Sequence, residues 1–558
     1  MQGSPVFEGT VVDEGSRVTL ALAGSGSFGG TLPASVIRKQ GPGTFSLATL
    51  PPVQRLEVQS GTLEIGSSYR FLGEGQFAAT IHGDGSYGRL HVRGQAQLGG
   101  GLRVERGAGP FVNGSRYEVL RADGGFAPGS SFERIELPAA TPLLSFASTQ
   151  ADGSLAVTAQ VKSFTTVAPG ADAQAVARQL DRVLPGVRGD LSAALGTLQG
   201  LTRAADFAAA FTSLSPLTHG QRTLASVASA DRFAQTIEQR MGGLQLAGRE
   251  AGAARALPVI VAANGNGGFW QRLEAAEQWQ ARPYGVWLQA FAQRGDQDAS
   301  SDASGYRYDL AGQALGADHR FDRNFSAGVA LGWVKNEFRS DVAGNRANLK
   351  SRLAALYGSY DGGDVYANAT LSAGTTSHDA QRTIVVGPTS TPVTSRHDAK
   401  LLAASFGAGL SRRAGEGWLD PFVNLRYTLV KEDAFTENGS GAALAVDGRS
   451  THTVVSELGL RWTQAFAVSG NARLIPEASA AWLHDFGHGS RLVQAAYVDA
   501  PEAGFAVEGQ RIERNGLRLG LGVTYRSGGG LSSLLRYSAE IRPGYRAQGL
   551  VGELRYEF

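Results

Sequence analysis

The residue types of a hydrolytic site lie close together between residues 82 and 91. His82, Asp84, Ser86 and His91 could supply a base, an orienting carboxylate and a nucleophile. A catalytic triad is defined by geometry in the folded protein, however, and proximity along the chain does not create that geometry. Because these residues fall in a glycine-rich strand–turn–strand pattern, we expect them to be structural and not catalytic.

A second group, His484, Asp485 and His488, has the residue types of a metal site. Ligands four residues apart converge on a helix, but this group stands where a strand runs into a long polar loop. We therefore expect solvated histidines and no bound metal.

Other catalytic patterns are missing from the sequence. It has no G-x-S-x-G motif and no phosphate-binding loop, and its cysteine count of 0 removes cysteine nucleophiles and cysteine–zinc sites. The 52 Lys and Arg residues nearly balance the 50 Asp and Glu residues, so nothing indicates a nucleic-acid partner. We expect neither enzyme activity nor a cofactor in this chain.

Many of the remaining charged residues lie on segments in which apolar and polar side chains alternate with a period of two. In the final segment, one face carries Leu550, Gly552, Leu554, Tyr556 and Phe558, and the other carries Val551, Glu553, Arg555 and Glu557. Residues 325–333 repeat the pattern, with Phe325, Val329 and Trp333 on the apolar face. An apolar face towards lipid and a polar face towards a lumen is typical of a transmembrane strand.

From Tyr284 to Phe558 the chain divides into twelve such segments, which begin near Tyr284, Tyr306, Asn324, Asn348, Asp364, Ser395, Trp418, Thr451, Asn471, Ile512, Leu531 and Arg546. Short turns such as Asp361–Asp364 alternate with long polar connections, which are Asp296–Gly305, Arg339–Ala347, His378–Thr394, Lys431–Ser450 and Phe486–Arg511. Short periplasmic turns and long external loops are typical of outer-membrane barrels. We predict a twelve-stranded antiparallel transmembrane β-barrel with both ends on the periplasmic side.

This barrel should have a charged lumen and aromatic girdles at the membrane interfaces. The charges expected to face the lumen are Arg307, Asp309, Arg352, Arg426, Glu457, Glu477, Arg555 and Glu557. The aromatic residues expected in the girdles are Trp287, Trp333, Tyr357, Tyr360, Trp418, Trp462, Trp482, Tyr525 and Tyr556. The alternative for the aromatics, core packing in a soluble β protein, does not explain the alternating loops.

Ahead of the barrel the apolar residues recur at helical spacing. We predict helices near Asp172–Pro185, with Asp172 as the N-cap, and over Asp190–Gly200 and Ala204–Leu214. A longer helix, Arg222–Leu244, is slim in its N-terminal part, with an apolar stripe on one face and charges on the other. At 1.5 Å per residue it spans roughly 34 Å, enough to thread a bilayer-thick pore. The alternative is a surface helix of a soluble linker.

Three features resemble the classical monomeric autotransporters of type V secretion. Tyr284–Phe291 and Gly305–Asp318 resemble the first two barrel strands of that family. Ala230–Phe233 followed by Arg240 resembles the helix that plugs these barrels. The resemblance implies a pore helix that uses Asp231, Arg232, Phe233, Ile237, Glu238 and Arg240.

The C-terminal sequence LRYEF resembles the outer-membrane signature that the barrel-assembly machinery reads as an added β-strand. Its alternate residues Leu554, Tyr556 and Phe558 would form this assembly signal. The resemblance further implies outer-membrane lipid, periplasmic chaperones and the chain's own passenger as partners of a monomer. Some family members cut themselves at an Asn in the pore. Because Arg222–Leu244 contains no Asn, and Asn264 and Asn266 lie in a glycine-rich turn, we do not expect this cleavage.

Residues before about Val167 predict short strands between glycine-rich turns. Ile37–Leu47 and Leu56–Ile65 resemble the passenger-associated transport repeat, and Tyr117–Phe126 resembles the cap that ends such stems. Regularly spaced short strands fit a partial right-handed parallel β-helix in which each rung stacks on the one before. The alternative is a small, unrelated β-sandwich.

We therefore predict four parts: a passenger stem (1–167), a helical linker (168–221), a pore helix and connection (222–283) and a barrel (284–558). The expected function is an outer-membrane translocator that secretes an N-terminal passenger and anchors it at the surface of a Gram-negative cell. The start of the sequence lacks the features of a signal peptide, so we expect that signal to have been removed. The alternatives are a serine protease or esterase domain upstream of residue 1, an adhesive stem, and a simple porin.

Overall fold

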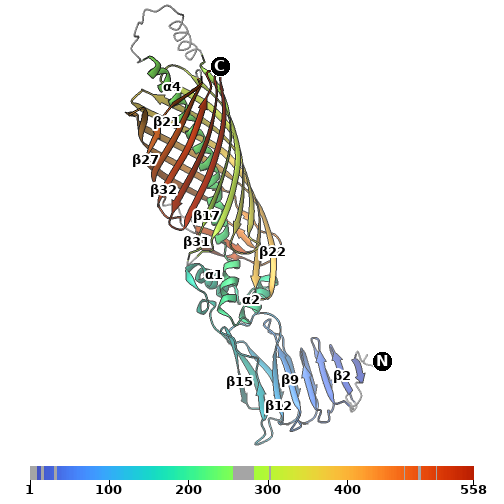
Figure 1. Ribbon diagram of the computed structural model, residues 1–558. Helices are drawn as coiled ribbons and strands as arrows, with labels where there is room; N and C mark the ends of the chain where they lie inside the picture. The colour runs from blue at the N-terminus through green and yellow to red at the C-terminus, as the bar shows by residue number, and fades with distance from the viewer. Residues whose placement is uncertain are drawn as a thin grey trace, which may run out of the picture.

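The computed structural model of the protein describes residues 9–13, 18–29, 34–255, 282–300, 303–469, 472–487, 492–509 and 512–558. It is an elongated molecule with a β-rich stem, a group of short helices, and a barrel through which a long helix runs (Figure 1). Within those ranges, no helix combines the length and hydropathy that a bilayer crossing requires.

The described residues of the stem form sixteen short strands. They are β1 (Gly9–Asp13), β2 (Val18–Ala23), β3 (Gly26–Phe28), β4 (Val36–Gln40), β5 (Thr44–Leu47), β6 (Arg55–Val58), β7 (Gly61–Ile65), β8 (Tyr69–Arg70), β9 (Gln76–Ile81), β10 (Gly88–Val92), β11 (Ala96–Gln97), β12 (Gly101–Arg106), β13 (Arg116–Ala122), β14 (Arg134–Glu136), β15 (Leu144–Ala151) and β16 (Ser154–Val161). Two long sheets, β1-β2-β4-β6-β9-β12-β14 and β15-β16-β13-β10-β7-β5-β3, contain most of them.

Parallel stacking builds the middle of the stem. Strands β2 to β14 of one sheet and β3 to β13 of the other pair in parallel. Leu47, Ile65, Val92 and Ala122 are register partners on successive rungs, and all four are buried. Burying a Leu, Ile or Val side chain contributes about 1.5–3 kcal/mol, so each rung is stabilised by the next. The parallel ladders agree with the predicted β-helix. The two ends of the stack differ from it, because β1 pairs antiparallel with β2 and β16 pairs antiparallel with β13.

The predicted cap, Tyr117–Phe126, lies where the pairing changes direction. Strand β13 pairs in parallel with β10 on one side and antiparallel with β16 on the other. The β15–β16 hairpin then ends the stack. The single-turn helix η1 (Phe164–Thr166) leads from it to α1 (Gly170–Val183), α2 (Gly189–Gln199) and α3 (Ala204–Leu214).

Helix α1 begins before the residue that the sequence predicted as its N-cap. Its N-cap is Pro169, which makes no side-chain capping bond, and Asp172 lies in the first turn instead. The prediction was wrong because an acidic residue is favourable both as an N-cap and within the first turn, where it faces the positive end of the helix dipole.

Twelve strands form the barrel wall. They are β17 (Tyr284–Gln297), β18 (Tyr306–Arg320), β19 (Phe325–Ser340), β20 (Arg346–Asp361), β21 (Val365–Val386), β22 (Thr389–Leu410), β24 (Gly417–Glu432), β27 (Arg449–Thr463), β29 (Ala472–Asp485), β32 (Asn515–Arg526), β33 (Leu531–Arg542) and β34 (Tyr545–Glu557), with β23 (Arg412–Ala414) and β28 (Phe466–Ser469) as short additions. Antiparallel pairing of β17 with β34 and of β22 with β24 closes the wall. The predicted twelve-stranded antiparallel barrel is confirmed.

The two faces of the wall agree with the alternation in the sequence. On β34 the outward residues Leu550, Leu554 and Tyr556 are 49 %, 56 % and 49 % exposed, whereas Val551 and Glu553 are buried in the lumen. For two of the aromatic residues the predicted position in a membrane-interface girdle is wrong. Trp287 and Tyr357 are buried inside the barrel, because the parity of their strands points them inward.

The apolar outer band ends sharply towards the long-loop end of the barrel. Leu331, Ala354, Ala373, Leu402 and Leu429 form one outward row across five strands. The next outward row on the same strands is Trp333, Arg352, Thr375, Lys400 and Lys431. Strands of this region therefore extend beyond the apolar band into water.

This extension explains three expected lumen charges that face outward. Arg307 and Arg352 are exposed on the outer face, and Asp309, also on that face, pairs with Arg294. Sequence alternation alone does not show where a strand leaves the lipid, so polar outward positions above the membrane look like lumen positions. Arg426, Glu457, Glu477, Arg555 and Glu557 are buried on the inner face.

The long connections are more ordered than the sequence predicted. The predicted loop His378–Thr394 is the continuation of the β21–β22 hairpin. Parts of Lys431–Ser450 and Phe486–Arg511 form a four-stranded sheet of β25 (Phe435–Thr436), β26 (Leu444–Val446), β30 (Leu492–Tyr497) and β31 (Ala500–Glu508). These strands are short and interrupted by polar residues, so their apolar positions form no recognisable period in the sequence.

The position of the apolar band makes a prediction about charged substitutions. Leu521, in the middle of β32, is 63 % exposed on the outer face, whereas Thr375 lies in the outward row that already carries lysine and arginine. We expect Leu521→Arg to destabilise the folded barrel by about 2–4 kcal/mol and Thr375→Arg by about 0–1 kcal/mol. Urea titration of the chain refolded into lipid vesicles measures both. Equal losses of unfolding free energy in the two variants would contradict the position assigned to the apolar outer band.

Candidate functional site

One helix occupies the lumen of the barrel along its length: α4 (Leu217–Arg255) (Figure 1). With 39 residues it is longer than the predicted Arg222–Leu244. Its first turn lies in the segment that was predicted as the helical linker, residues 168–221. In the structure that turn is enclosed by the long loops, with Leu217 and Gln221 buried.

Helix α4 runs from the long-loop end of the barrel to the short-turn end. Near its start, Asn345 donates a hydrogen bond to the Thr218 hydroxyl, at 3.3 Å. Further along the helix, Arg240 binds Asp318, close to the end of β18. Residues before Leu217 therefore lie at the opposite end of the barrel from Tyr284 and Phe558, the two ends of the barrel wall (Figure 1).

At the short-turn end a buried ion pair holds the helix. The Nε and Nη2 atoms of Arg240 donate to the same carboxylate oxygen of Asp318, at 2.9 and 2.8 Å. The Tyr357 hydroxyl also donates to this oxygen, at 3.1 Å, and in turn accepts from the Trp287 indole at 2.7 Å. Glu553 lies 3.8 Å from Arg240. Since both partners of the pair are almost fully buried, loss of one would leave an uncompensated charge in a low-dielectric site.

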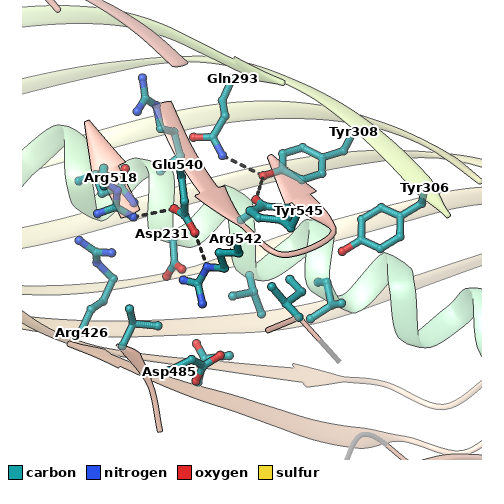
Figure 2. A pocket seen from close by; sticks show the side chains of 18 residues that line it. Asp231, Gln293, Tyr306, Tyr308, Arg426, Asp485, Arg518, Glu540, Arg542 and Tyr545 are labelled. Carbon is teal, nitrogen blue, oxygen red and sulfur yellow. Dashed lines mark hydrogen bonds and ion pairs between the residues drawn. The ribbon is translucent and has the colours of Figure 1, made fainter. Parts of the chain in front are cut away.

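In the middle of the lumen, charged helix residues contact the wall. Glu238 accepts from Arg426 at 2.9 and 2.7 Å, and Asp231 accepts from the Thr428 hydroxyl at 2.6 Å. Arg232 donates to the Leu550 carbonyl at 3.1 Å. Around these contacts the wall pairs its own charges, such as Arg518 with Glu540 (Figure 2). Every polar side chain predicted for the pore helix thus has a partner in the barrel.

The apolar stripe of α4 packs against the inner face of the wall, where glycine leaves room for it. Phe233 and Ile237 are completely buried, in the same cluster as Trp287 and Phe291. Gly332 of β19 makes room for Phe233, because a Cβ atom there would lie 2.3 Å from the phenylalanine ring. The position therefore requires glycine for the helix to approach this closely.

At the long-loop end the helix start joins a second charge network. Both guanidinium Nε and Nη2 of Arg382 donate to Glu437, at 2.9 and 2.5 Å, and His219 of α4 lies 3.1 Å from the same carboxylate. Burial alone would raise the pKa of Glu437, but Arg382 and His219 hold that pKa well below its usual range. Helix α3 is also attached to this end of the barrel, because the Ser213 hydroxyl forms hydrogen bonds with the backbone carbonyl and N–H of Val385 on β21.

Little space remains beside the helix. Two polar cavities flank it, of about 80 and 120 Å³. Asp231, Arg426 and Arg518 line the first cavity (Figure 2). Glu238, Arg461 and Glu477 line the second. A cavity of this size holds several water molecules. Neither of these two cavities has room for a second polypeptide segment beside α4.

The two other candidate groups do not form catalytic or metal sites in the described part of the chain. Ser86 bonds Asp84 at 2.7 Å and not a histidine, while His91 lies 3.0 Å from Asp123 on the stem surface. His484 bonds Asn515 on the outer face of the barrel. His488, Asn264 and Asn266 lie outside the described residues.

The assembly-signal residues Leu554, Tyr556 and Phe558 all lie on the outer face, about half exposed. Phe558 pairs with Tyr284 through two backbone hydrogen bonds of 3.2 and 3.0 Å. The C-terminal strand thus forms the seam of the closed wall together with the first strand.

Sequence reasoning missed the wall partners of the helix. Asp318, Trp287 and Tyr357 at one end, and Arg382 and Glu437 at the other, were not singled out for this role. The inward parity of Asp318 on β18 was a usable signal, because an acidic residue inside a barrel needs a partner. Glu437 had no such signal, since it lies in a loop.

These features define a class of protein: a membrane-type β-barrel with an α-helix inside its pore. Residues 286–538 match the family model described as Autotransporter beta-domain. This part of the chain is an autotransporter β-domain, the type of barrel that inserts in the outer membrane.

Curated relatives match part of the chain. An "Extracellular serine protease" of Serratia marcescens is 25 % identical over 286 residues, which cover 51 % of this chain and 27 % of that protein. "Esterase EstA" of Pseudomonas aeruginosa is 26 % identical over 202 residues, which cover 35 % of this chain and 30 % of that protein. The chain thus spans between a quarter and a third of the length of these relatives.

Among solved structures, the translocator domain of autotransporter NalP from Neisseria meningitidis aligns with a TM-score of 0.40 and 21 % identity. The alignment covers 52 % of this chain and 94 % of that domain.

The ion pair at the short-turn end makes a prediction about the plug. We expect Arg240→Ala to cost about 3–5 kcal/mol, because Asp318 and Glu553 are left buried without their main counter-charge. The variant should unfold at lower temperature on a heat-modifiability gel and should raise the conductance of the barrel in planar bilayers. Gln239→Ala, one position earlier on the helix, is the matched control. If the two variants behave alike in both measurements, Arg240 does not hold the helix.

Proposed function

We propose that this chain is an outer-membrane translocator that carries an N-terminal passenger across the membrane and anchors it at the cell surface. The observation that supports this most strongly is the direction of α4. The helix connects the stem to the barrel through the lumen, so the stem and the ends of the barrel wall lie on opposite sides (Figure 1). Both barrel ends belong to the short-turn side, which in outer-membrane barrels is periplasmic.

The stem is suited to a passenger that folds after it has crossed. Each parallel rung buries its apolar residues against the previous one, so folding can propagate from a stable end. The β13–β16 region, next to the helices, would be such an end outside the cell.

The filled lumen fits the end of transport better than an open channel. The helix forms buried charge contacts towards both ends of the barrel, and the two cavities that flank it have volumes of about 80 and 120 Å³. A simple porin would instead keep a continuous aqueous path. We infer that α4 seals the barrel once the passenger is outside.

A second proposal concerns activity upstream of residue 1. The translocator part carries no catalytic arrangement among its described residues, but two relatives are named as a serine protease and an esterase. An enzymatic passenger ahead of the stem is therefore a candidate. A catalytic motif in the reading frame before Met1 would support it, and a frame that starts at Met1 would contradict it.

Proteolysis of intact cells tests the proposed topology. We expect an added protease to remove residues before Leu217 while the fragment from Tyr284 to Phe558 stays intact, because the wall and α4 are shielded by lipid and by each other. An antibody against the C-terminus detects the protected fragment, and a periplasmic protein serves as the control for cell integrity. Protection of the stem on intact cells, followed by its digestion after the outer membrane is permeabilised, would contradict the topology.

A further inference from the structure

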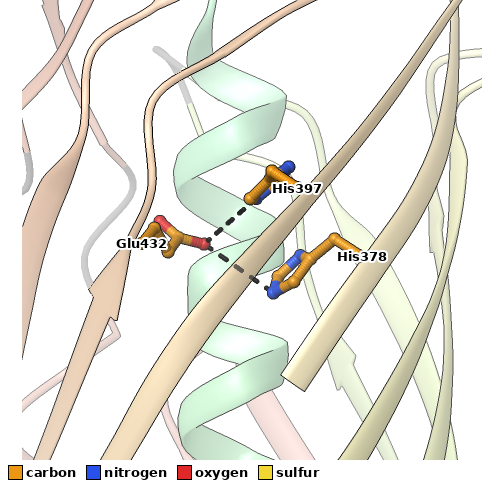
Figure 3. Close-up of side chains that lie close together, drawn as sticks. All are labelled: His378, His397 and Glu432. Carbon is orange, nitrogen blue, oxygen red and sulfur yellow. Dashed lines mark ion pairs between the residues drawn. The ribbon is translucent and has the colours of Figure 1, made fainter. Parts of the chain in front are cut away.

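We propose that the long-loop end of the lumen holds a site for a divalent transition-metal ion, with His378, His397 and Glu432 as ligands (Figure 3). These three residues come from β21, β22 and β24, which are neighbours in the barrel wall. All three face the lumen and are buried.

The register of the wall creates the convergence. His378 and His397 are direct cross-strand partners, and their rings stack with centroids 4.4 Å apart. Glu432 lies on the next strand, where it is the partner of Ala399. Its Oε1 atom is 4.0 Å from His378 Nε2 and 3.9 Å from His397 Nε2. One ligand atom from each residue lies within 4.8 Å of the others.

These distances suit a metal ion better than they suit hydrogen bonds. At 3.9 and 4.0 Å the imidazole nitrogens and the carboxylate oxygen are too far apart to bond each other. An ion between them, with metal–ligand distances of about 2.0–2.2 Å, would need only small inward shifts of the three side chains. Three protein ligands leave a further position for water or for the Ser226 hydroxyl, which lies 3.0 Å from His378 Nε2.

Unsatisfied polar atoms provide an independent observation. Both ring nitrogens of His397, the Nδ1 of His378 and the Oε1 of Glu432 are buried and have no hydrogen-bond partner. Buried polar groups without a hydrogen-bond partner are rare in folded proteins and are energetically unfavourable. An ion would satisfy two of these atoms, His397 Nε2 and Glu432 Oε1, at once.

Neighbouring side chains orient the Glu432 carboxylate for metal binding. Arg449 lies 2.5 Å from Glu432 Oε2, and the Thr223 hydroxyl of α4 donates to the same oxygen at 2.8 Å. Oε2 is thereby occupied, and Oε1 points at the imidazoles. Such outer contacts orient metal ligands in proteins.

The charged residues near the site determine how tightly we expect it to bind the metal ion. Arg449 and Arg222 lie nearby, while Arg382 is already neutralised by Glu437. The guanidinium groups oppose a divalent ion, so we expect weaker binding than at a closed four-ligand zinc site. Bound metal would join three wall strands beside Thr223 and Ser226, and would thus reinforce the seal at the start of α4.

Zinc binding to the full-length chain tests the proposal. The untagged protein, refolded in detergent and stripped with a chelator, is dialysed against zinc chloride, and its zinc content is measured by elemental analysis. We expect one zinc per chain, lost again on chelation, and a cobalt-loaded sample with the visible absorption of nitrogen- and oxygen-bound Co²⁺. No zinc above the buffer level would overturn the proposal.

Two variants locate the site. His397→Ala removes a ligand that makes no hydrogen bond of its own in the described structure, and it should abolish zinc binding and the cobalt spectrum. His452→Ala, on the outer face of β27, should leave both unchanged. Migration of unheated samples on a gel shows that each variant is folded, and His397→Gln provides a second loss of the ligand if His397→Ala does not fold. Equal zinc content in folded His397 and His452 variants would overturn the assignment.

Discussion

The arrangement depends on one interaction, the buried pairing of Arg240 with Asp318 inside the barrel. A helix that crosses a lumen must leave no charge unpaired, because the surrounding dielectric is low and water is scarce. Such a pair adds little net stability relative to an apolar contact of the same shape, but it strongly penalises any other register of the helix. The pair therefore acts mainly to specify the position of α4 along the lumen. The Tyr357–Trp287 chain and Glu553 extend the same constraint into three strands of the wall.

The other end of the helix is held by a different kind of contact. Helices α1 to α3 share a hydrophobic core with the β25–β26–β30–β31 sheet and with the tip of the β21–β22 hairpin. Direct bonds add to it, such as that from Tyr497 to the Leu214 carbonyl at 3.2 Å. The stem is thus docked on the long loops through these helices and is not attached by a free tether. A plug fixed at one end by charge and at the other by packing is consistent with a sealed final state.

Strands were more predictable from the sequence than the contacts between elements. The period of two on β19 and β34 and the alternation of loop lengths were sufficient for the barrel, because lipid and lumen impose opposite chemistry on the two faces. The pore helix could be predicted from its slim, half-charged sequence, but its partners could not. Asp318 and Glu553 reach Arg240 through pairings of β17, β18 and β34 that no local pattern contains. Trp287 was placed at the membrane interface for a different reason, because its residue type suggested a girdle although the parity of its strand points it inward.

The most direct test of the account uses the absence of cysteine, of which the sequence has 0. A single cysteine can be placed at Ser86, exposed in the stem, or at Ser469, exposed beside a short turn of the barrel, and each is then the only thiol. Intact cells are treated with a maleimide that does not cross the outer membrane. We expect labelling of Ser86→Cys on intact cells, and of Ser469→Cys only after the outer membrane is permeabilised. The reverse pattern would contradict the claim that α4 carries the chain through the barrel to the outside.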